Sequence, residues 1–191
     1  MGLRFSKPFR AADELSLIAQ ALSSGHIAGD GKWTEEASKR LSDILEGAAI
    51  LLTTSGTHAL ELAALLHGIG DCDEVVMPSF TFSSTANAFA LRGARNRFAD
   101  VDPGSFSMEM GDVEAALTPT TTAVVAMPYG GVIRDMSAIA KFCRDRGLKF
   151  VEYNAHGLFG SSGGQALGTF APLGALSFHQ TKNRRWGLDR E

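Results

Sequence analysis

One lysine near the end of the chain has the surroundings of a reactive amine. Residues 173–178 form an apolar run typical of a buried strand, and Lys182 follows it within a stretch of Ser, His, Thr and Asn. In an open α/β sheet, ligands bind beyond the carboxyl ends of the strands. A lysine at such a point can attach an aldehyde as a Schiff base. A surface lysine after a strand is the alternative, and the rest of the chain must decide between the two.

Residues 53–58, Thr-Thr-Ser-Gly-Thr-His, form a second polar stretch, between an apolar run and a predicted helix. Free N–H groups and the dipole at a helix N-terminus attract a phosphate, and hydroxyl groups add donors. Capping of the helix by Ser55 or Thr57 explains the same residue types without a ligand. The chain has neither a Walker A lysine motif nor GxGxxG. A nucleoside triphosphate or dinucleotide site is therefore not indicated.

Two more predicted strand ends carry residues of interest. Phe82 follows the strand that Pro78 closes, and it could stack on a planar ring, although packing in the core is the alternative. His156 follows the strand at 149–152 and could donate a hydrogen bond or act as an acid or base, or be purely structural. The histidines show no metal-ligand spacing. No GxSxG turn suggests a hydrolase.

Helices and strands must alternate to position these residues. Apolar periodicity and caps predict helices at 11–23, 34–46, 57–66, 83–91, 112–117 and 135–146. Apolar runs predict strands at 48–52, 74–77, 97–101, 123–127, 149–152 and 174–178. Strands with little polar alternation, separated mostly by helices, indicate an α/β fold with a largely parallel sheet covered by helices on both faces. Residues 160–168 are expected to form a flexible loop.

Composition narrows the classes of function. The chain has 191 residues, 45% hydrophobic and 20% charged, with a formal net charge of -3. This balance argues against nucleic-acid and membrane partners. Two distant cysteines without zinc spacing fit a reducing, cytoplasmic setting. We expect one domain over residues 1–191.

A phosphate turn, a ring-stacking aromatic and a Schiff-base lysine together describe a site for pyridoxal phosphate. With these motifs the chain resembles the DegT/DnrJ/EryC1/StrS family of sugar aminotransferases, of fold type I, from about Phe5 to Asn183. The resemblance is carried by Ser23-Ser24-Gly25 with Gly29-Asp30-Gly31, Leu51-Leu52-Thr53 with Ser55-Gly56-Thr57, Met77-Pro78-Ser79-Phe80-Thr81-Phe82 with Ser84-Thr85-Ala86-Asn87-Ala88-Phe89, and Ser177-Phe178-His179 with Thr181-Lys182-Asn183.

The resemblance implies a role for each site residue. Lys182 matches the lysine that forms the internal aldimine and later moves the proton. Gly56 and Thr57 match the phosphate-binding turn, Ser177 matches a hydroxyl that also reaches the phosphate, and Phe82 matches the aromatic against the pyridine ring. The implied cofactor-binding set is Ser55, Gly56, Thr57, Phe82, His156, Ser177 and Lys182.

The resemblance also implies a reaction. Family members transfer an amino group, usually from glutamate, to a keto sugar attached to a nucleotide, and they work as homodimers. A 4-keto-6-deoxy sugar on dTDP, made for a cell-surface polysaccharide, is the implied acceptor. Family dehydratases replace the lysine with histidine, and Lys182 argues against that reaction.

One position departs from the family within the site. The family reads Glu-Asp-Ala-Ala-Gln where this chain has Glu152-Tyr153-Asn154-Ala155-His156. The expected aspartate pairs with the pyridinium nitrogen and keeps it protonated, and Tyr153 cannot supply that charge at neutral pH. Glu152 is expected to point to the opposite face of the strand. His156 takes the place of the glutamine near the phenolic oxygen of the ring.

The end of the chain departs as well. Residues 184–191 form an atypical tail, and the chain is roughly half the usual length of the family. We expect a truncated product that lacks the C-terminal small domain. The alternative function is therefore an inactive remnant that binds the cofactor weakly or not at all.

Overall fold

The computed structural model describes residues 11–132, 136–179 and 182. The helices are α1 (Glu14–Ser23), α2 (Lys32–Ile44), α3 (Gly56–Leu66), α4 (Ser84–Ala90), α5 (Met110–Ala116) and α6 (Met136–Asp145), with a 3-10 turn η1 (Tyr129–Gly131). The strands are β1 (Glu74–Pro78), β2 (Arg95–Ala99), β3 (Thr121–Ala126), β4 (Lys149–Asn154), β5 (Ser161–Ser162), β6 (Gln165–Ala166) and β7 (Leu173–Leu176).

The chain divides into two compact units, which are described separately. The first comprises residues 1–52 and 180–191 and contains α1 and α2. The second comprises residues 53–179 and contains all the strands. No helix in the described part of the chain is long and apolar enough to cross a membrane.

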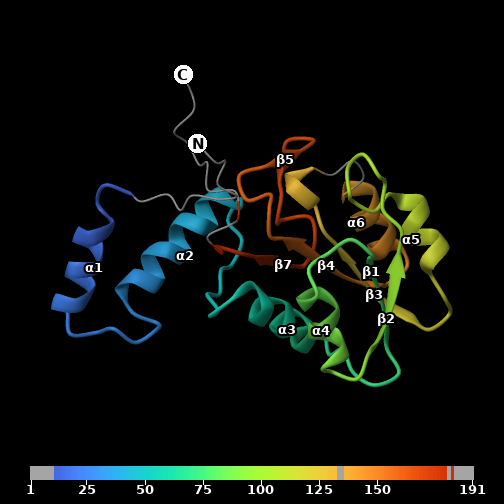
Figure 1. Ribbon diagram of the computed structural model, residues 1–191, viewed down its shortest axis with the longest axis horizontal. Coiled ribbons are helices and arrows are strands. Elements are labelled where there is room, and N and C mark those ends of the chain that lie inside the picture. The colour runs from blue at the N-terminus through green and yellow to red at the C-terminus, as the bar shows by residue number, and fades with distance from the viewer. Residues whose placement is uncertain (1–10, 133–135, 180–181, 183–191) are drawn as a thin grey trace, which may run out of the picture. The chain divides into compact units, whose positions relative to one another are not determined.

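A five-stranded parallel sheet organises the second unit, in the order β2-β1-β3-β4-β7. Helices α3 and α4 cover one face of it, and α5 and α6 cover the other (Figure 1). Parallel strands need helical cover on both faces, which explains why β1 is buried at every position. The predicted parallel α/β fold is confirmed.

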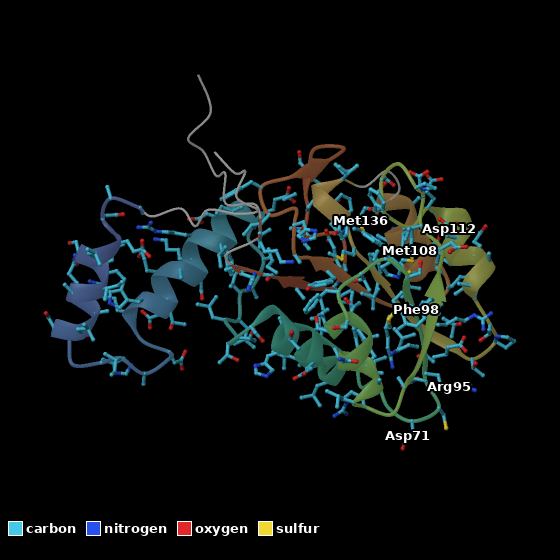
Figure 2. The ribbon with its side chains drawn as sticks, viewed as in Figure 1. Asp71, Arg95, Phe98, Met108, Asp112 and Met136 are labelled. Carbon is cyan, nitrogen blue, oxygen red and sulfur yellow. The ribbon has the colours of Figure 1, made fainter. Side chains whose placement is uncertain are left out.

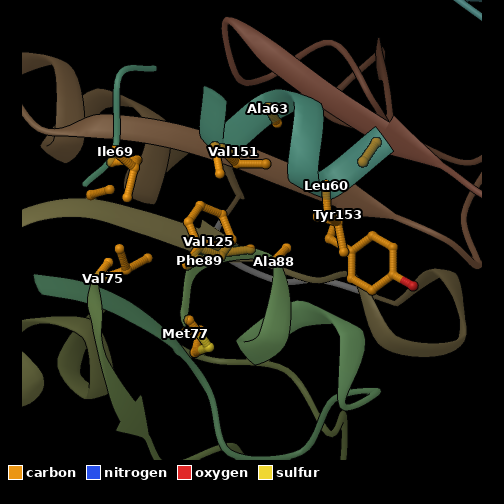
Figure 3. Packing of buried hydrophobic residues seen from close by; sticks show 14 of the residues in the cluster. Leu60, Ala63, Ile69, Val75, Met77, Ala88, Phe89, Val125, Val151 and Tyr153 are labelled. Atoms are coloured by element: carbon orange, nitrogen blue, oxygen red, sulfur yellow. The ribbon is translucent and has the colours of Figure 1, made fainter. Parts of the chain in front are cut away.

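Alternation along the strands sorts the apolar side chains into two cores. Val75 and Met77 of β1 join Leu60 and Phe89 in a core beneath α3 and α4, which we call the α3/α4 core (Figure 3). Val76, one residue away, joins the core beneath α5 and α6, the α5/α6 core. The latter core also holds Met108 and Met136, which Figure 2 labels.

Two predicted segments differ from the structure. Residues 48–52 were expected to be a strand, but they carry no strand or helix. Leu51 is 71% exposed and Leu52 is 39% exposed, whereas a parallel strand must be buried and hydrogen-bonded to its neighbours. A short apolar run alone does not select a strand. Within the expected loop at 160–168, β5 and β6 pair as a two-stranded antiparallel hairpin.

Candidate active site

The N-terminus of α3 presents the polar stretch predicted to bind a phosphate. Ser55 is the N-cap in extended conformation, and its Oγ accepts a hydrogen bond of 3.2 Å from the His58 N–H. Gly56 and Thr57 form the first turn and are half-buried. The capping role and an anion role are compatible, because a cap satisfies one N–H group and leaves others of the first turn free.

Ser177 lies directly against this helix start. A Cβ built at Gly56 would lie 3.1 Å from Ser177 Cβ, 3.3 Å from Ser177 Oγ and 3.2 Å from the Leu176 carbonyl oxygen. Only glycine lets the two backbones approach so closely without displacing atoms. Two stretches more than a hundred residues apart in the sequence thus place a hydroxyl and a helix N-terminus at one point.

Phe82 precedes α4 and is 61% exposed, so its ring is not part of either core. Its carbonyl oxygen accepts a hydrogen bond of 2.9 Å from the Thr85 N–H, which anchors the backbone at the helix start. The exposed ring therefore remains available for stacking on a planar group.

His156 lies among aromatic rings at the carboxyl ends of β3 and β4. Its ring meets Tyr129 edge-on at 4.9 Å between centroids, and its Nδ1 accepts a hydrogen bond of 3.2 Å from the Gly130 N–H. Tyr129 in turn contacts Phe80 and Phe106. Since Nδ1 is an acceptor, the neutral tautomer carries its proton on Nε2, which can donate.

Tyr153 and Glu152 point to opposite faces of β4, as expected. Tyr153 is buried in the α3/α4 core, and burial raises the pKa of its phenol above the ordinary value of 10. Glu152 is fully buried on the other face, where it lies beside the loop that leads into β7. Glu152 therefore cannot replace the aspartate that the family places at position 153.

The Glu152 carboxylate holds that loop by hydrogen bonds. Its Oε1 accepts from the Gly168 N–H at 2.6 Å, and its Oε2 accepts from the Phe170 N–H at 3.0 Å. Burial raises the pKa of this carboxyl to about 7, although the N–H donors act in the opposite direction. Gly174 leaves room for the loop, since a Cβ there would lie 2.6 Å from the Gly168 carbonyl oxygen.

Lys182 belongs to the first unit, whereas the other predicted site residues belong to the second. It is half-buried, and burial lowers the pKa of its amine below the ordinary value of 10.5. A lowered pKa leaves more of the amine neutral and nucleophilic. Residues 180–181 and the predicted tail at 184–191 lie outside the described residues.

Ser84 is a residue that the sequence did not single out as part of a site. It is 4% exposed at the start of α4, and its Oγ has no hydrogen-bond partner of normal geometry among the described residues. Its hydroxyl lies close enough to the Tyr153 phenol to oppose the rise in that group's pKa. No sequence signal distinguishes it, because Ser83-Ser84-Thr85 also fits an ordinary helix start.

A separate groove of about 680 Å³ lies in the first unit, between α1 and the start of α2. Residues such as Gln20, His26 and Trp33 line it, and none of the predicted site residues does. The groove is therefore separate from the predicted site residues, all of which except Lys182 belong to the second unit.

Comparison with known proteins agrees with this arrangement. The chain is 37% identical over 181 residues to dTDP-4-dehydro-2,3,6-trideoxy-D-glucose 4-aminotransferase of Saccharopolyspora spinosa. The matched region covers 94% of this chain and 47% of that protein. The chain thus spans about half the length of this relative.

Solved structures of aminotransferases also match this chain over about half of their own length. The aminotransferase TlmJ from Streptoalloteichus hindustanus matches with a TM-score of 0.89 at 36% identity, over 94% of this chain and 49% of that one. The PMP-form of the sugar aminotransferase Spr1654 from Streptococcus pneumoniae, described as putative, matches with a TM-score of 0.87 at 25% identity, over 96% of this chain and 50% of that one.

A family model confirms the predicted resemblance. The model of the DegT/DnrJ/EryC1/StrS aminotransferase family matches residues 9–187. The prediction of pyridoxal phosphate as the cofactor is confirmed for this family, since one of the matching structures holds the amino form. The chain belongs to the DegT/DnrJ/EryC1/StrS aminotransferase family.

Proposed function

We propose that this chain forms the cofactor-binding part of a pyridoxal-phosphate-dependent aminotransferase that acts on nucleotide-linked keto sugars. The observation that carries the proposal is the close approach of Gly56 and Ser177 at the start of α3. A helix N-terminus, a backbone without a Cβ and a hydroxyl fit a phosphate group at this point. Family membership supplies the rest of the argument.

The residues would share the work as follows. The α3 N-terminus, with Gly56, Thr57 and Ser177, would hold the phosphate, and Phe82 would stack on the ring. Nε2 of His156 would donate a hydrogen bond to the phenolic oxygen. Ser55 keeps the turn in place by capping α3. When bound, pyridoxal phosphate supplies an aldehyde for linkage to amines and a ring that accepts electrons.

Lys182 would supply the amine that carries the cofactor and moves the proton. It follows Ser177 by five residues, and a chain of that length spans at most about 17 Å. The lowered pKa of Lys182 favours the neutral amine that such a linkage requires.

The finer predictions concern the substrate and the assembly. The proposed acceptor is a 4-keto-6-deoxy sugar on dTDP and the proposed donor is glutamate, in the synthesis of a cell-surface polysaccharide. A relative that acts on a dTDP-linked 4-dehydro sugar supports this choice. A homodimer in the cytoplasm is the proposed assembly, and the exposed apolar side chains Leu15, Ile18 and Leu22 of α1 offer a surface for one.

A second candidate function is cofactor binding with little or no amino transfer. Tyr153 favours it, because a neutral phenol stands where the family has a carboxylate. Glutamate separates the two candidates: production of 2-oxoglutarate by the cofactor-loaded chain supports transfer, and its absence in a chain that binds the cofactor supports the second candidate.

The experiment that tests the site uses two glycine variants. Gly56→Ala places a methyl group against Ser177 and the Leu176 carbonyl, so cofactor affinity should fall at least about tenfold. Gly111→Ala on α5 is the matched control, because no atom of the described residues lies within 4 Å of a Cβ there. The readout is the visible absorbance of pyridoxal phosphate titrated into each chain. Equal affinity of Gly56→Ala and the parent would overturn the proposed phosphate site.

A further inference from the structure

Tyr153 brings a polar atom to the edge of an apolar core. It is the penultimate residue of β4 and is only 3% exposed. It belongs to the same buried core as Leu60 and Phe89, and its hydroxyl points away from the labelled apolar side chains (Figure 3). The carboxyl end of β4 is also where the family places the aspartate that meets the cofactor ring, so the hydroxyl replaces a carboxylate.

Ser84 adds a second polar atom at the same place. Its buried Oγ lies beside the Tyr153 phenol and has no hydrogen-bond partner of normal geometry within the described ranges. A buried hydroxyl without a partner costs about 1–3 kcal/mol. Such a group in a folded protein commonly marks a site that a ligand or a water completes. Ser84 also follows Phe82, the proposed ring-stacking residue, by two positions.

The charge state of this pair follows from its surroundings. Burial keeps the Tyr153 phenol protonated at neutral pH, so it can donate a hydrogen bond but carries no negative charge. The nearest carboxylate along the strand, Glu152, lies on the opposite face and binds Gly168 and Phe170. The Glu152 carboxyl group therefore does not contact the Tyr153 phenol on the α3/α4 side of the sheet.

We propose that Tyr153 and Ser84 form a neutral binding pair for the ring nitrogen of the cofactor, in which the phenol donates a hydrogen bond to an unprotonated pyridine. With the cofactor bound, the Ser84 hydroxyl would orient the phenol by donating to its oxygen. The proton stays on the phenol oxygen throughout. This inference rests on the proposed function, because it concerns the same cofactor site.

The pair changes what the site can do. A carboxylate holds the pyridine in its protonated form, which makes the ring a strong electron acceptor. A neutral donor binds the ring without that effect. Binding and attachment to the lysine are retained, whereas the amino transfer step should be slower by at least about a hundredfold.

The test is nitrogen NMR of pyridoxamine phosphate labelled with ¹⁵N in the ring and bound to the full chain. This form of the cofactor needs no link to Lys182. The parent chain should give the shift of an unprotonated, hydrogen-bonded pyridine. Tyr153→Asp should give that of a protonated ring, and Tyr153→Phe that of a pyridine without a donor.

Ser84→Ala provides a milder variant that keeps the core volume. It should weaken binding about threefold to tenfold and shift the nitrogen signal toward that of Tyr153→Phe. Ser83→Ala is its matched control, because Ser83 is exposed and makes no side-chain cap bond. Ser84→Ala with the affinity and signal of the parent would contradict the role of Ser84.

The outcomes separate this inference from the function on which it rests. A protonated ring in the parent chain would contradict the proposed neutral pair of Tyr153 and Ser84, but not the proposed cofactor site. Failure of the folded parent chain and of a folded Tyr153→Asp variant to bind the cofactor overturns both.

Discussion

The two faces of β4 carry neighbouring polar residues with opposite roles. On the α5/α6 face, the Glu152 carboxylate is fully buried and accepts N–H bonds from Gly168 and Phe170. On the α3/α4 face, the Tyr153 phenol lies beside Ser84, whose hydroxyl lacks a normal partner within the described residues. A satisfied buried group stabilises a loop, and an unsatisfied one lacks a hydrogen bond that a ligand can supply. The first face is structural, and we assign the second to the cofactor.

Removing the carboxylate should have the largest effect. Glu152→Ala leaves the buried N–H groups of Gly168 and Phe170 without an acceptor, so the free energy of unfolding should fall by about 3–5 kcal/mol. Denaturant unfolding followed by circular dichroism measures this. Glu114→Ala, at an exposed position on α5, is the control and should change stability by less than about 0.5 kcal/mol. Similar losses in the two variants would show that the loop does not depend on Glu152.

The same carboxyl should give the stability a pH dependence. Burial raises its pKa from 4.5 to about 7, so between these values the folded state holds a proton that the unfolded state has lost. The stability contributed by Glu152 is therefore full below about pH 4.5 and is lost as the pH rises through about 7, a change of about 3 kcal/mol.

Glu152→Gln isolates this effect, because it has no proton to lose and other groups titrate equally in both chains. Between about pH 5 and about pH 8, the unfolding free energy of the parent should therefore fall relative to that of Glu152→Gln. A constant difference would mean that Glu152 does not titrate in this range.

Tyr153→Phe should have the smallest effect on stability. The ring keeps its place in the α3/α4 core, and the lost hydroxyl makes no normal bond to Ser84. The free energy of unfolding should change by less than about 1 kcal/mol in the absence of cofactor. A loss as large as that of Glu152→Ala would make the phenol part of the folded core and remove the contrast between the two faces.

The sequence predicted the strands of the main sheet better than the segments outside it. The apolar runs at 123–127 and 149–152 overlap the buried parallel strands β3 and β4, and strand alternation placed Glu152 and Tyr153 on opposite faces. The run at 48–52 failed, because its composition does not distinguish a buried strand from an exposed extended segment. The β5–β6 hairpin was missed because its strands are two residues long.

Less of the candidate site could be predicted from the sequence. The motifs predicted that Gly56 and Ser177 belong to it, and the structure adds that these two residues lie against each other. The lack of a normal partner for the Ser84 hydroxyl among the described residues depends on distances that no sequence pattern encodes. The assignment of the α3/α4 side to a cofactor therefore rests on the sequence motifs together with the positions of Ser177 and Ser84 in the structure.

Chemical trapping of the cofactor on Lys182 tests the central claim most directly. The chain is incubated with pyridoxal phosphate, reduced with borohydride, digested and mapped by mass spectrometry. We expect the pyridoxyl mass on Lys182, its loss in Lys182→Ala, and an unchanged label in Lys39→Ala, which alters an exposed lysine of α2. A folded chain that takes no label, or takes it equally on exposed lysines, would contradict the account.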